Sequence, residues 1–243
     1  MMKRALLFGA TGAIGQSAAR TLAAAGWSLY LQGWHHMDRI GALLTDLAAD
    51  YPQQEFLPLQ LDFTARDAVA ALTPQLYGVD ALVFSQGITD YELFAEAPAA
   101  VLDAQWQVNV RMPLLITQAL QEKLAQSGHG RVVYLGSVYG GQGSPMEVMY
   151  STTKGALSAF AQAYAREVAS LGITVNVLAP GAVDTPMNAA MLAGGAKTAL
   201  AAEIPAGRLA QPQDIAYWLQ VLLAPQAQYL TGQTIYVSGG WRI

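Results

Sequence analysis

Short apolar runs alternate along the chain with longer segments in which apolar residues recur every three or four positions. Runs at 5–8, 29–31 and 56–61 are apolar almost throughout, whereas 16–25 and 39–49 have the helical spacing. Short runs of the first kind are typical of buried parallel strands, and the second pattern indicates amphipathic helices. The first half of the chain therefore predicts strands joined by helices.

The same alternation continues into the second half. Long apolar helices are predicted over 99–126 and 149–171. Neither a linker rich in proline, glycine or serine nor a charge run nor an internal repeat interrupts the pattern. We therefore predict an α/β fold in which residues 1–243 form a single doubly wound, Rossmann-type domain with helices on both faces of the sheet.

A glycine-rich turn, Gly9-Ala10-Thr11-Gly12-Ala13-Ile14-Gly15, joins the first predicted strand to the first predicted helix. Glycines in such a turn let the backbone approach a pyrophosphate, and the free amides of the helix N-terminus attract its charge. The spacing is looser than G-x-G-x-x-G, and a turn of this kind can be purely structural. A second motif must therefore support the prediction of a dinucleotide site.

Ser137, Tyr150 and Lys154 supply that motif. Positions i and i+4 share one helix face, so a phenol would lie beside an ammonium. A free tyrosine ionises near pH 10, and a cation within a few ångströms typically lowers such a pKa by about 1 to 3 units. We expect Lys154 to lower the pKa of Tyr150, which suits an acid that protonates a carbonyl during its reduction. A lone Tyr-x-x-x-Lys pair is more often plain helix surface.

Together the two motifs resemble those of the short-chain dehydrogenase/reductase family, in the family's order and over almost the whole chain. Residues 79–83 look like the family's fourth strand, and 175–181 resemble its sixth strand with the Pro180-Gly181 turn. Asn109 falls within a long predicted helix, and 229–233 with 237–240 resemble the family's last strand and its flanks. The resemblance implies a seven-stranded, mostly parallel sheet and a variable substrate lid at about 187–203. It also implies NAD(P)H-dependent reduction of a ketone to an alcohol.

The resemblance assigns roles to individual residues. Tyr150 would donate the proton, Ser137 would stabilise the substrate oxygen, Lys154 would hold the ribose, and Asn109 would position a water that resupplies protons. The residues that it places around the dinucleotide are Gly9, Thr11, Gly12, Ala13, Ile14, Gly15, Asp62, Gly87, Tyr150, Lys154, Pro180, Gly181, Val183 and Thr185. Asp62 would contact adenine or, as the plain alternative, be the N-cap of a helix that begins at Thr64.

Two segments depart from the family's pattern. Phe84-Ser85-Gln86-Gly87 stands where relatives commonly have Asn-Asn-Ala-Gly, so we expect the bracing of this strand by an asparagine to be lost. No acid ends the second predicted strand, where an NAD site needs one for the ribose hydroxyls, and Asp38 comes several residues too late. His35, His36 or Arg39 could instead meet a 2′-phosphate. We predict NADPH in preference to NADH, with His35 in the cofactor site.

The substrate stays open at this point. Segments 165–170, 204–209 and 231–233 resemble bacterial 3-oxoacyl-acyl-carrier-protein reductases, but Gly128 and Leu171 stand where those enzymes grip the acidic carrier with basic residues. Residues 140–154 resemble the reductases that act on the 5-aminopentanone-modified lysine of elongation factor P. A non-catalytic redox sensor of the same architecture is a third possibility, against which the intact Ser137, Tyr150 and Lys154 argue.

Composition excludes several kinds of binding site and partner. A content of 53% hydrophobic and 12% charged residues suits a parallel sheet covered on both faces, and a net charge of −4 does not support nucleic-acid binding. Zero cysteines exclude disulfides and zinc-thiolate sites, and adjacent histidines do not converge on a metal, so no metal site is predicted. No stretch is long enough for a signal peptide or a membrane span. We predict a cytoplasmic homodimer or homotetramer acting on a small-molecule, carrier-bound or protein-attached ketone.

Overall fold

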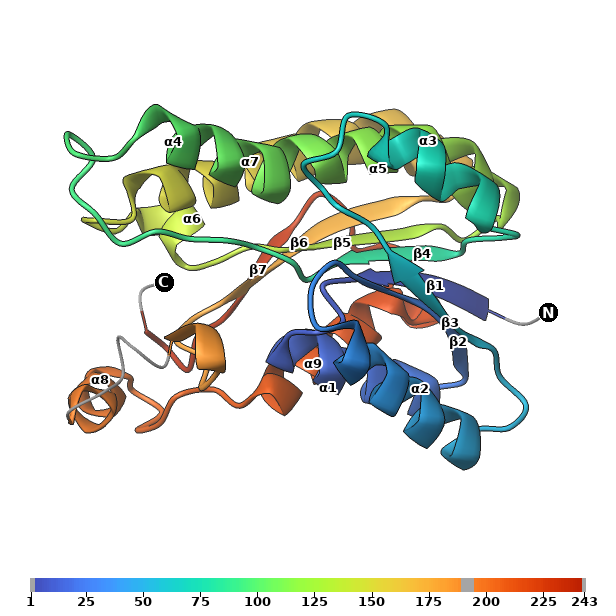
Figure 1. Cartoon of the computed structure of the whole chain (residues 1–243), viewed down its shortest axis with the longest axis horizontal. Coiled ribbons are helices and arrows are strands. Elements are labelled where there is room, and N and C mark those ends of the chain that lie inside the picture. Colours follow the sequence, from blue (N-terminus) through green and yellow to red (C-terminus); the bar gives the residue numbers. More distant parts are fainter. Residues whose placement is uncertain (1–2, 189–194, 242–243) are drawn as a thin grey trace.

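Seven parallel strands form the centre of the protein, in the order β3-β2-β1-β4-β5-β6-β7 (Figure 1). The computed structural model describes residues 3–188 and 195–241. The strands are β1 Lys3–Phe8, β2 Trp27–Gly33, β3 Phe56–Gln60, β4 Ala81–Phe84, β5 Arg131–Leu135, β6 Thr174–Pro180 and β7 Thr234–Val237. The helices are α1 Ala13–Ala24, α2 Met37–Asp50, α3 Ala68–Leu72, α4 Ala99–Trp106, α5 Met112–Gln126, α6 Tyr139–Gln142, α7 Val148–Val168, α8 Ala196–Glu203 and α9 Pro212–Leu223.

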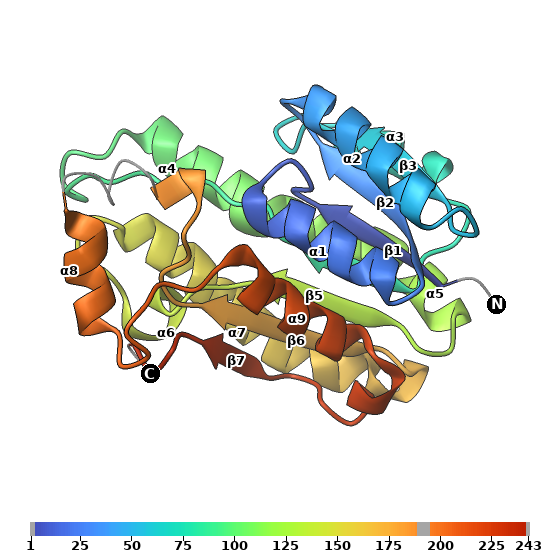
Figure 2. The same ribbon diagram turned by 90° about the horizontal axis from the view of Figure 1, so that it is seen from below.

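Helices cover both faces of the sheet, as the apolar strands require. Helices α3, α4, α5 and α7 lie on one face, and α1, α2 and α9 lie on the other (Figures 1 and 2). Successive strand residues point to opposite faces, so Leu6 and Phe8 join the core under α5 and α7, while Ala5 and Leu7 join the core under α1 and α9. The predicted α/β fold is confirmed, and every strand pair is parallel.

The order of the strands reverses at β1, which pairs with β2 on one side and with β4 on the other. The connections from β1 and from β4 therefore leave the sheet in opposite directions and open a crevice at the carboxyl ends of these strands. Ligands of open α/β sheets bind at such a switch point. The glycine-rich turn after β1 and Gly87 after β4 both lie there.

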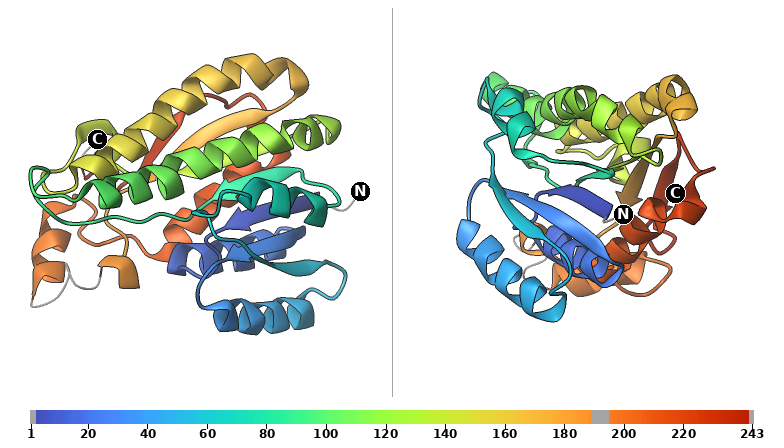
Figure 3. Two further views of the ribbon diagram at one scale, coloured as in Figure 1. Left: turned by 45° about the horizontal axis from the view of Figure 1, so that its top comes forward. Right: turned by 90° about the vertical axis from the view of Figure 1, so that its right-hand side faces the viewer.

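Several boundaries differ from those predicted. The helix expected over 99–126 is interrupted by a π-helical turn, η2 Gln107–Arg111, between α4 and α5. Of the lid expected at about 187–203, a 3₁₀ turn at Pro186–Asn188 and α8 are described, and 189–194 lie outside the described residues. Helix α8, drawn in orange, lies apart from the sheet (Figure 3). In the described part of the chain no helix is both long and apolar enough to cross a membrane.

Candidate active site

The turn after β1 depends on two of its glycines. Gly9 has φ +75°, and a Cβ atom there would lie 2.6 Å from the Gln86 backbone nitrogen. A Cβ atom on Gly15 would collide with the Gly9 carbonyl oxygen, so the first turn of α1 can pack against β1 only without a side chain. Gly12 is the N-cap of α1, and no acidic residue occupies the first helical turn. The amides of Ala13, Ile14 and Gly15 are therefore available to an anion.

An open cleft runs from this turn across the carboxyl ends of β4, β5 and β6. It is lined by twelve of the predicted site residues: Gly12, Ala13, Ile14, Gly15, Gly87, Ser137, Tyr150, Lys154, Pro180, Gly181, Val183 and Thr185. The remaining lining residues are Arg39, Ser85, Gln86, Leu135, Gly136, Pro186, Met187 and Asn188. The glycine turn and the Ser-Tyr-Lys trio, 122 residues apart between Gly15 and Ser137, thus share one cavity.

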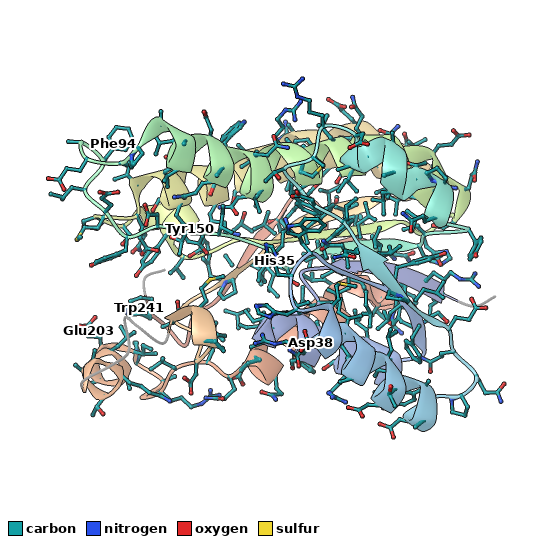
Figure 4. All side chains as sticks on the ribbon, viewed as in Figure 1. His35, Asp38, Phe94, Tyr150, Glu203 and Trp241 are labelled. Carbon is teal, nitrogen blue, oxygen red and sulfur yellow. The ribbon has the colours of Figure 1, made fainter. Side chains whose placement is uncertain are left out.

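Ser137, Tyr150 and Lys154 come together as the spacing predicts. Tyr150 and Lys154 lie one turn apart near the start of α7, and the Lys154 Nζ atom lies 5.4 Å from the centroid of the Tyr150 ring. The Ser137 hydroxyl, just beyond the end of β5, forms a hydrogen bond with the Tyr150 phenol. Lys154 Nζ donates to the Leu135 carbonyl oxygen at 2.7 Å. Figure 4 shows Tyr150 beside the carboxyl ends of the strands.

The pKa of Tyr150 differs from the sequence-based expectation. Burial raises this pKa above its usual value, the Glu147 carboxylate raises it further, and the hydrogen bond with Ser137 lowers it. The expectation that Lys154 lowers it is wrong for this arrangement, because the ammonium is directed at the Leu135 carbonyl and lies over the ring. Burial in turn lowers the pKa of Lys154 to about 8.

Asn109 lies behind the trio in the π-helical turn. Its amide bonds both backbone groups of Ile88, accepting from the nitrogen and donating to the oxygen at 2.9 Å each, and it also donates to the Thr153 hydroxyl at 3.2 Å. A Cβ atom on Gly87 would lie 3.4 Å from Lys154 Nζ and 3.6 Å from Asn109 Oδ1. Asn109 thereby fixes the segment that passes directly over the Lys154 ammonium.

Four other predicted site residues, together with Asn109, do not line the cleft. Gly9 and Thr11 lie within the turn that shapes it. The Asp62 carboxylate accepts from the Thr64 amide at 2.8 Å and from its hydroxyl at 2.7 Å. These bonds close a turn, and the helix expected from Thr64 onward is absent because α3 begins only at Ala68. His35 is exposed on the loop before α2, whereas Arg39 on that helix reaches the cleft.

Two of the polar residues that brace the site were missed by the sequence analysis. Gln32 is buried at the end of β2, where it accepts from the Gly9 amide at 3.1 Å and donates to the Leu61 carbonyl oxygen at 2.8 Å. A polar residue within an otherwise apolar strand was the available signal. Ser85 donates from its amide and its hydroxyl to the Phe8 carbonyl oxygen. The bracing expected to be lost with the family's asparagine is therefore supplied by Ser85.

Comparison with known proteins places the chain among reductases. A family model described as "Enoyl-(Acyl carrier protein) reductase" matches residues 9–242. The "Uncharacterized oxidoreductase YmfI" of Bacillus subtilis is 37% identical over 242 residues, covering 99% of each chain. The "3-oxoacyl-[acyl-carrier-protein] reductase FabG" of Escherichia coli is 33% identical over 250 residues, covering 98% of this chain and 96% of that one. The crystal structure of a 3-oxoacyl (acyl-carrier-protein) reductase from Agrobacterium tumefaciens with NADP bound has a TM-score of 0.91 at 26% identity, covering 98% of this chain and 94% of that one.

Proposed function

The chain belongs to the short-chain dehydrogenase/reductase family of NAD(P)-dependent oxidoreductases, and we propose that it is an NADPH-dependent reductase that converts a ketone on a flexible arm to an alcohol. The observation that carries this proposal is the hydrogen bond between Ser137 and Tyr150, formed above Lys154 in the cavity that also contains the glycine turn. A redox sensor has no need of an acid and a hydroxyl paired in this way.

The cleft is suited to a nicotinamide dinucleotide. The start of α1 lines the cleft and offers the amides of Ala13, Ile14 and Gly15 without a competing acid, which supports the binding of a pyrophosphate there. Pro180, Gly181, Val183 and Thr185 would hold the nicotinamide half, with Thr185 on the carboxamide, and Tyr150 and Lys154 would reach its ribose. When bound, the reduced nicotinamide supplies a hydride to the carbonyl carbon.

Arg39 favours the 2′-phosphate form of the cofactor. Strand β2 ends at Gly33, and Asp38, the first acid after it, is exposed in the first turn of α2 and does not line the cleft. A guanidinium recognises phosphate bidentately, which an exposed histidine such as His35 does not. Titration of both reduced cofactors at pH 7 tests this preference, and tighter binding of NADH would reject it.

In the proposed reaction the chain supplies one proton and one oxyanion contact. Tyr150 gives its phenolic proton to the ketone oxygen, and Ser137 donates a hydrogen bond to the same oxygen as charge develops on it. The raised pKa of Tyr150 keeps the phenol protonated before reaction. Asn109 holds the Ile88 backbone next to Lys154 and so keeps the ammonium in place.

Tyr150→Phe tests this assignment. We expect the variant to bind NADPH as the wild type does but to lose at least about 100-fold in kcat, the scale of a single general acid. Steady-state rates with a ketone panel and a fluorescence titration of NADPH measure the two quantities separately. Equal turnover in the variant and the wild type would remove Tyr150 from the role of proton donor and would favour the sensor.

Two substrate classes compete for this site. A 3-oxoacyl thioester on acyl carrier protein is supported by the FabG relatives, and a 5-aminopentanone-modified lysine of elongation factor P is the alternative. Because Gly128 and Leu171 replace the expected basic residues, we propose weak use of the carrier-bound thioester. Initial rates with acetoacetyl carrier protein, a small acetoacetyl thioester and modified elongation factor P compare the classes. A kcat/KM for acetoacetyl carrier protein that exceeds the value for the small thioester by more than about tenfold, equivalent to about 1.4 kcal/mol, would reverse this ranking.

A further inference from the structure

A small third core, separate from those on the two faces of the sheet, lies behind the turn that carries Ser137. Four segments that are distant in the sequence form it: the turn after β5, the turn after β6, α8 with the loop that follows it, and the segment after β7. Figure 4 shows Trp241 and Glu203, the last residue of α8, at the same end of the molecule. The buried members are Val138, Ala182, Ile204, Leu209 and Trp241, with Tyr139, Leu200 and Ala201 packed against them.

Trp241 is the largest buried member of this core and is 7% exposed. Its indole meets the ring of Tyr139 in an edge-to-face contact, with ring centroids 6.0 Å apart and planes inclined by 62°. The backbone that carries Trp241 is itself packed closely. The Ala206 amide donates to the Gly239 carbonyl oxygen at 3.0 Å, and a Cβ atom on Gly239 would lie 2.9 Å from Ala206 Cβ. The indole is therefore held against Tyr139 by its own anchored backbone.

Tyr139 reaches the catalytic trio through its backbone. Its amide donates to the Ser137 hydroxyl oxygen at 3.2 Å, and the same hydroxyl forms the hydrogen bond with the Tyr150 phenol. A hydroxyl has one proton and two lone pairs. With the Tyr139 amide on one lone pair, the proton and the second lone pair remain for Tyr150 and for a substrate oxygen. The direction of the Ser137 hydroxyl thus depends on where the Tyr139 amide lies.

We propose that Trp241 is a positioning residue of the reductase, which packs against Tyr139 and so holds the Ser137 hydroxyl where it meets the substrate oxygen. The inference rests on the ketone reductase function proposed above and adds a residue to that site. Trp241 is not among the described residues that line the cleft, so its effect on the reaction would pass through Ser137. Groups that bind a developing charge need such support, because their geometry must be held closely.

Two variants of Trp241 separate positioning from plain packing. Trp241→Ala removes the ring that meets Tyr139, so we expect kcat to fall at least about tenfold and the Kd for NADPH to change less than about twofold. Trp241→Phe restores an aromatic ring and should keep kcat within about threefold of the wild type. The matched control is Trp218→Ala, which removes a tryptophan 40% exposed on α9 and should leave kcat unchanged. Steady-state rates with the ketone panel and fluorescence titrations of NADPH measure these quantities.

A double-mutant cycle with Ser137→Ala tests the route. Once the hydroxyl is gone, Trp241 has nothing to position, so Trp241→Ala should lower the residual kcat of Ser137→Ala less than about twofold. Tyr139→Leu is a second variant that does not depend on the folding of Trp241→Ala. It keeps the amide that bonds Ser137 and removes the ring that meets the indole. It should lower kcat at least about fivefold in the wild-type background and less than about twofold in Ser137→Ala.

Each other outcome has a definite meaning. Wild-type kcat in both Trp241→Ala and Tyr139→Leu would overturn the inference and leave the reductase function intact. So would losses of the same factor with and without the Ser137 hydroxyl, because additive losses belong to residues that act independently. A wild type that reduces none of the ketones, with either cofactor, would remove the proposed function and the inference with it.

Discussion

Lys154 carries its charge in a position almost closed to water, with a side chain that is 3% exposed. Burial lowers its pKa from 10.5 to about 8. Between pH 8 and 10.5 the unfolded chain therefore binds more protons than the folded one, and the contribution of this residue to stability rises with pH. We expect the free energy of unfolding of the wild type to gain about 2 kcal/mol between pH 8 and 10 relative to Lys154→Met.

Urea unfolding of the cofactor-free proteins at pH 7, 8, 9 and 10 measures this difference. The range stops at pH 10 because the raised pKa of Tyr150 acts in the opposite sense above it: there the unfolded tyrosine ionises before the folded one. Lys123→Met on α5 is the matched control and should follow the wild type. A constant difference between the wild type and Lys154→Met would show that Lys154 titrates alike in both states.

Arg39 and His35 offer a second prediction at the scale of single residues. We expect Arg39→Ala to raise the Kd for NADPH at least about tenfold, or about 1.4 kcal/mol, and to change the Kd for NADH little, because only the phosphorylated ribose gives the guanidinium a partner. His35→Ala should change neither. Nicotinamide fluorescence titrations measure all four constants. If His35→Ala weakened NADPH binding more than Arg39→Ala does, the histidine would belong to the cofactor site as the sequence predicted.

The sequence predicted residues whose roles depend on spacing and missed those that depend on orientation. Ser137, Tyr150 and Lys154 meet because a helix turn and a strand end bring them together. The direction of the Lys154 ammonium is set by the Leu135 carbonyl, which no motif encodes. The reach of Arg39 likewise depends on where α2 begins, and that boundary follows His36 in a left-handed conformation with φ 56°.

At the scale of elements, the junction of β1 and α1 is the most constrained. Gly15→Ala would place a methyl group against the Gly9 carbonyl oxygen, so we expect a loss of about 1 to 3 kcal/mol in the free energy of unfolding. NADPH binding should weaken with it. Gly41→Ala in α2 is the control, since a Cβ atom there meets nothing within 4 Å and should stabilise the helix by about 0.5 to 1 kcal/mol. Urea unfolding measures the change in the free energy of unfolding for each variant. Equal changes in the two variants would contradict the predicted clash at Gly15.

Element types were predictable because the apolar period changes between strands and helices, but irregular turns were not. The π-helical turn Gln107–Arg111 inserts into what reads as a single helix over 99–126. Its cause is tertiary, because within this turn Asn109 bonds the Ile88 backbone of a different segment. Periodicity reports which face is buried and carries no signal for such a bond. Functional sites are where local pattern and final structure differ in this way.

For the whole molecule, sheet order explains why distant motifs act together. The reversal at β1 brings the turn at 9–15 next to Gly87, and the parallel pairing of β4, β5 and β6 adds Ser137 and Pro180 in sequence along the same edge. All strands point the same way, so their carboxyl ends supply one continuous cleft. Neither half of the chain contains the site alone.

A groove on the outer surface predicts the state of assembly. It lies between α5 and α7, and its lining includes Trp106, Leu114, Phe160 and Tyr164. Its further lining includes the polar residues Arg111, Gln118, Gln121 and Glu167. Trp106 is 42% exposed, and exposed aromatic residues together with an arginine are typical of an interface. We propose that the enzyme assembles as a homodimer or homotetramer through this face.

Trp106→Glu should therefore shift the particle to a smaller mass in light scattering at micromolar concentration, because a charge at the centre of an apolar interface cannot be solvated once two copies meet. Tyr77→Glu is the control: it also adds an acid at an aromatic position, 78% exposed in the loop that follows the 3₁₀ turn Thr73–Gln75, and should leave the mass unchanged. Circular dichroism of both variants separates dissociation from unfolding. A wild type that scatters as a single 25.8 kDa chain would contradict assembly altogether.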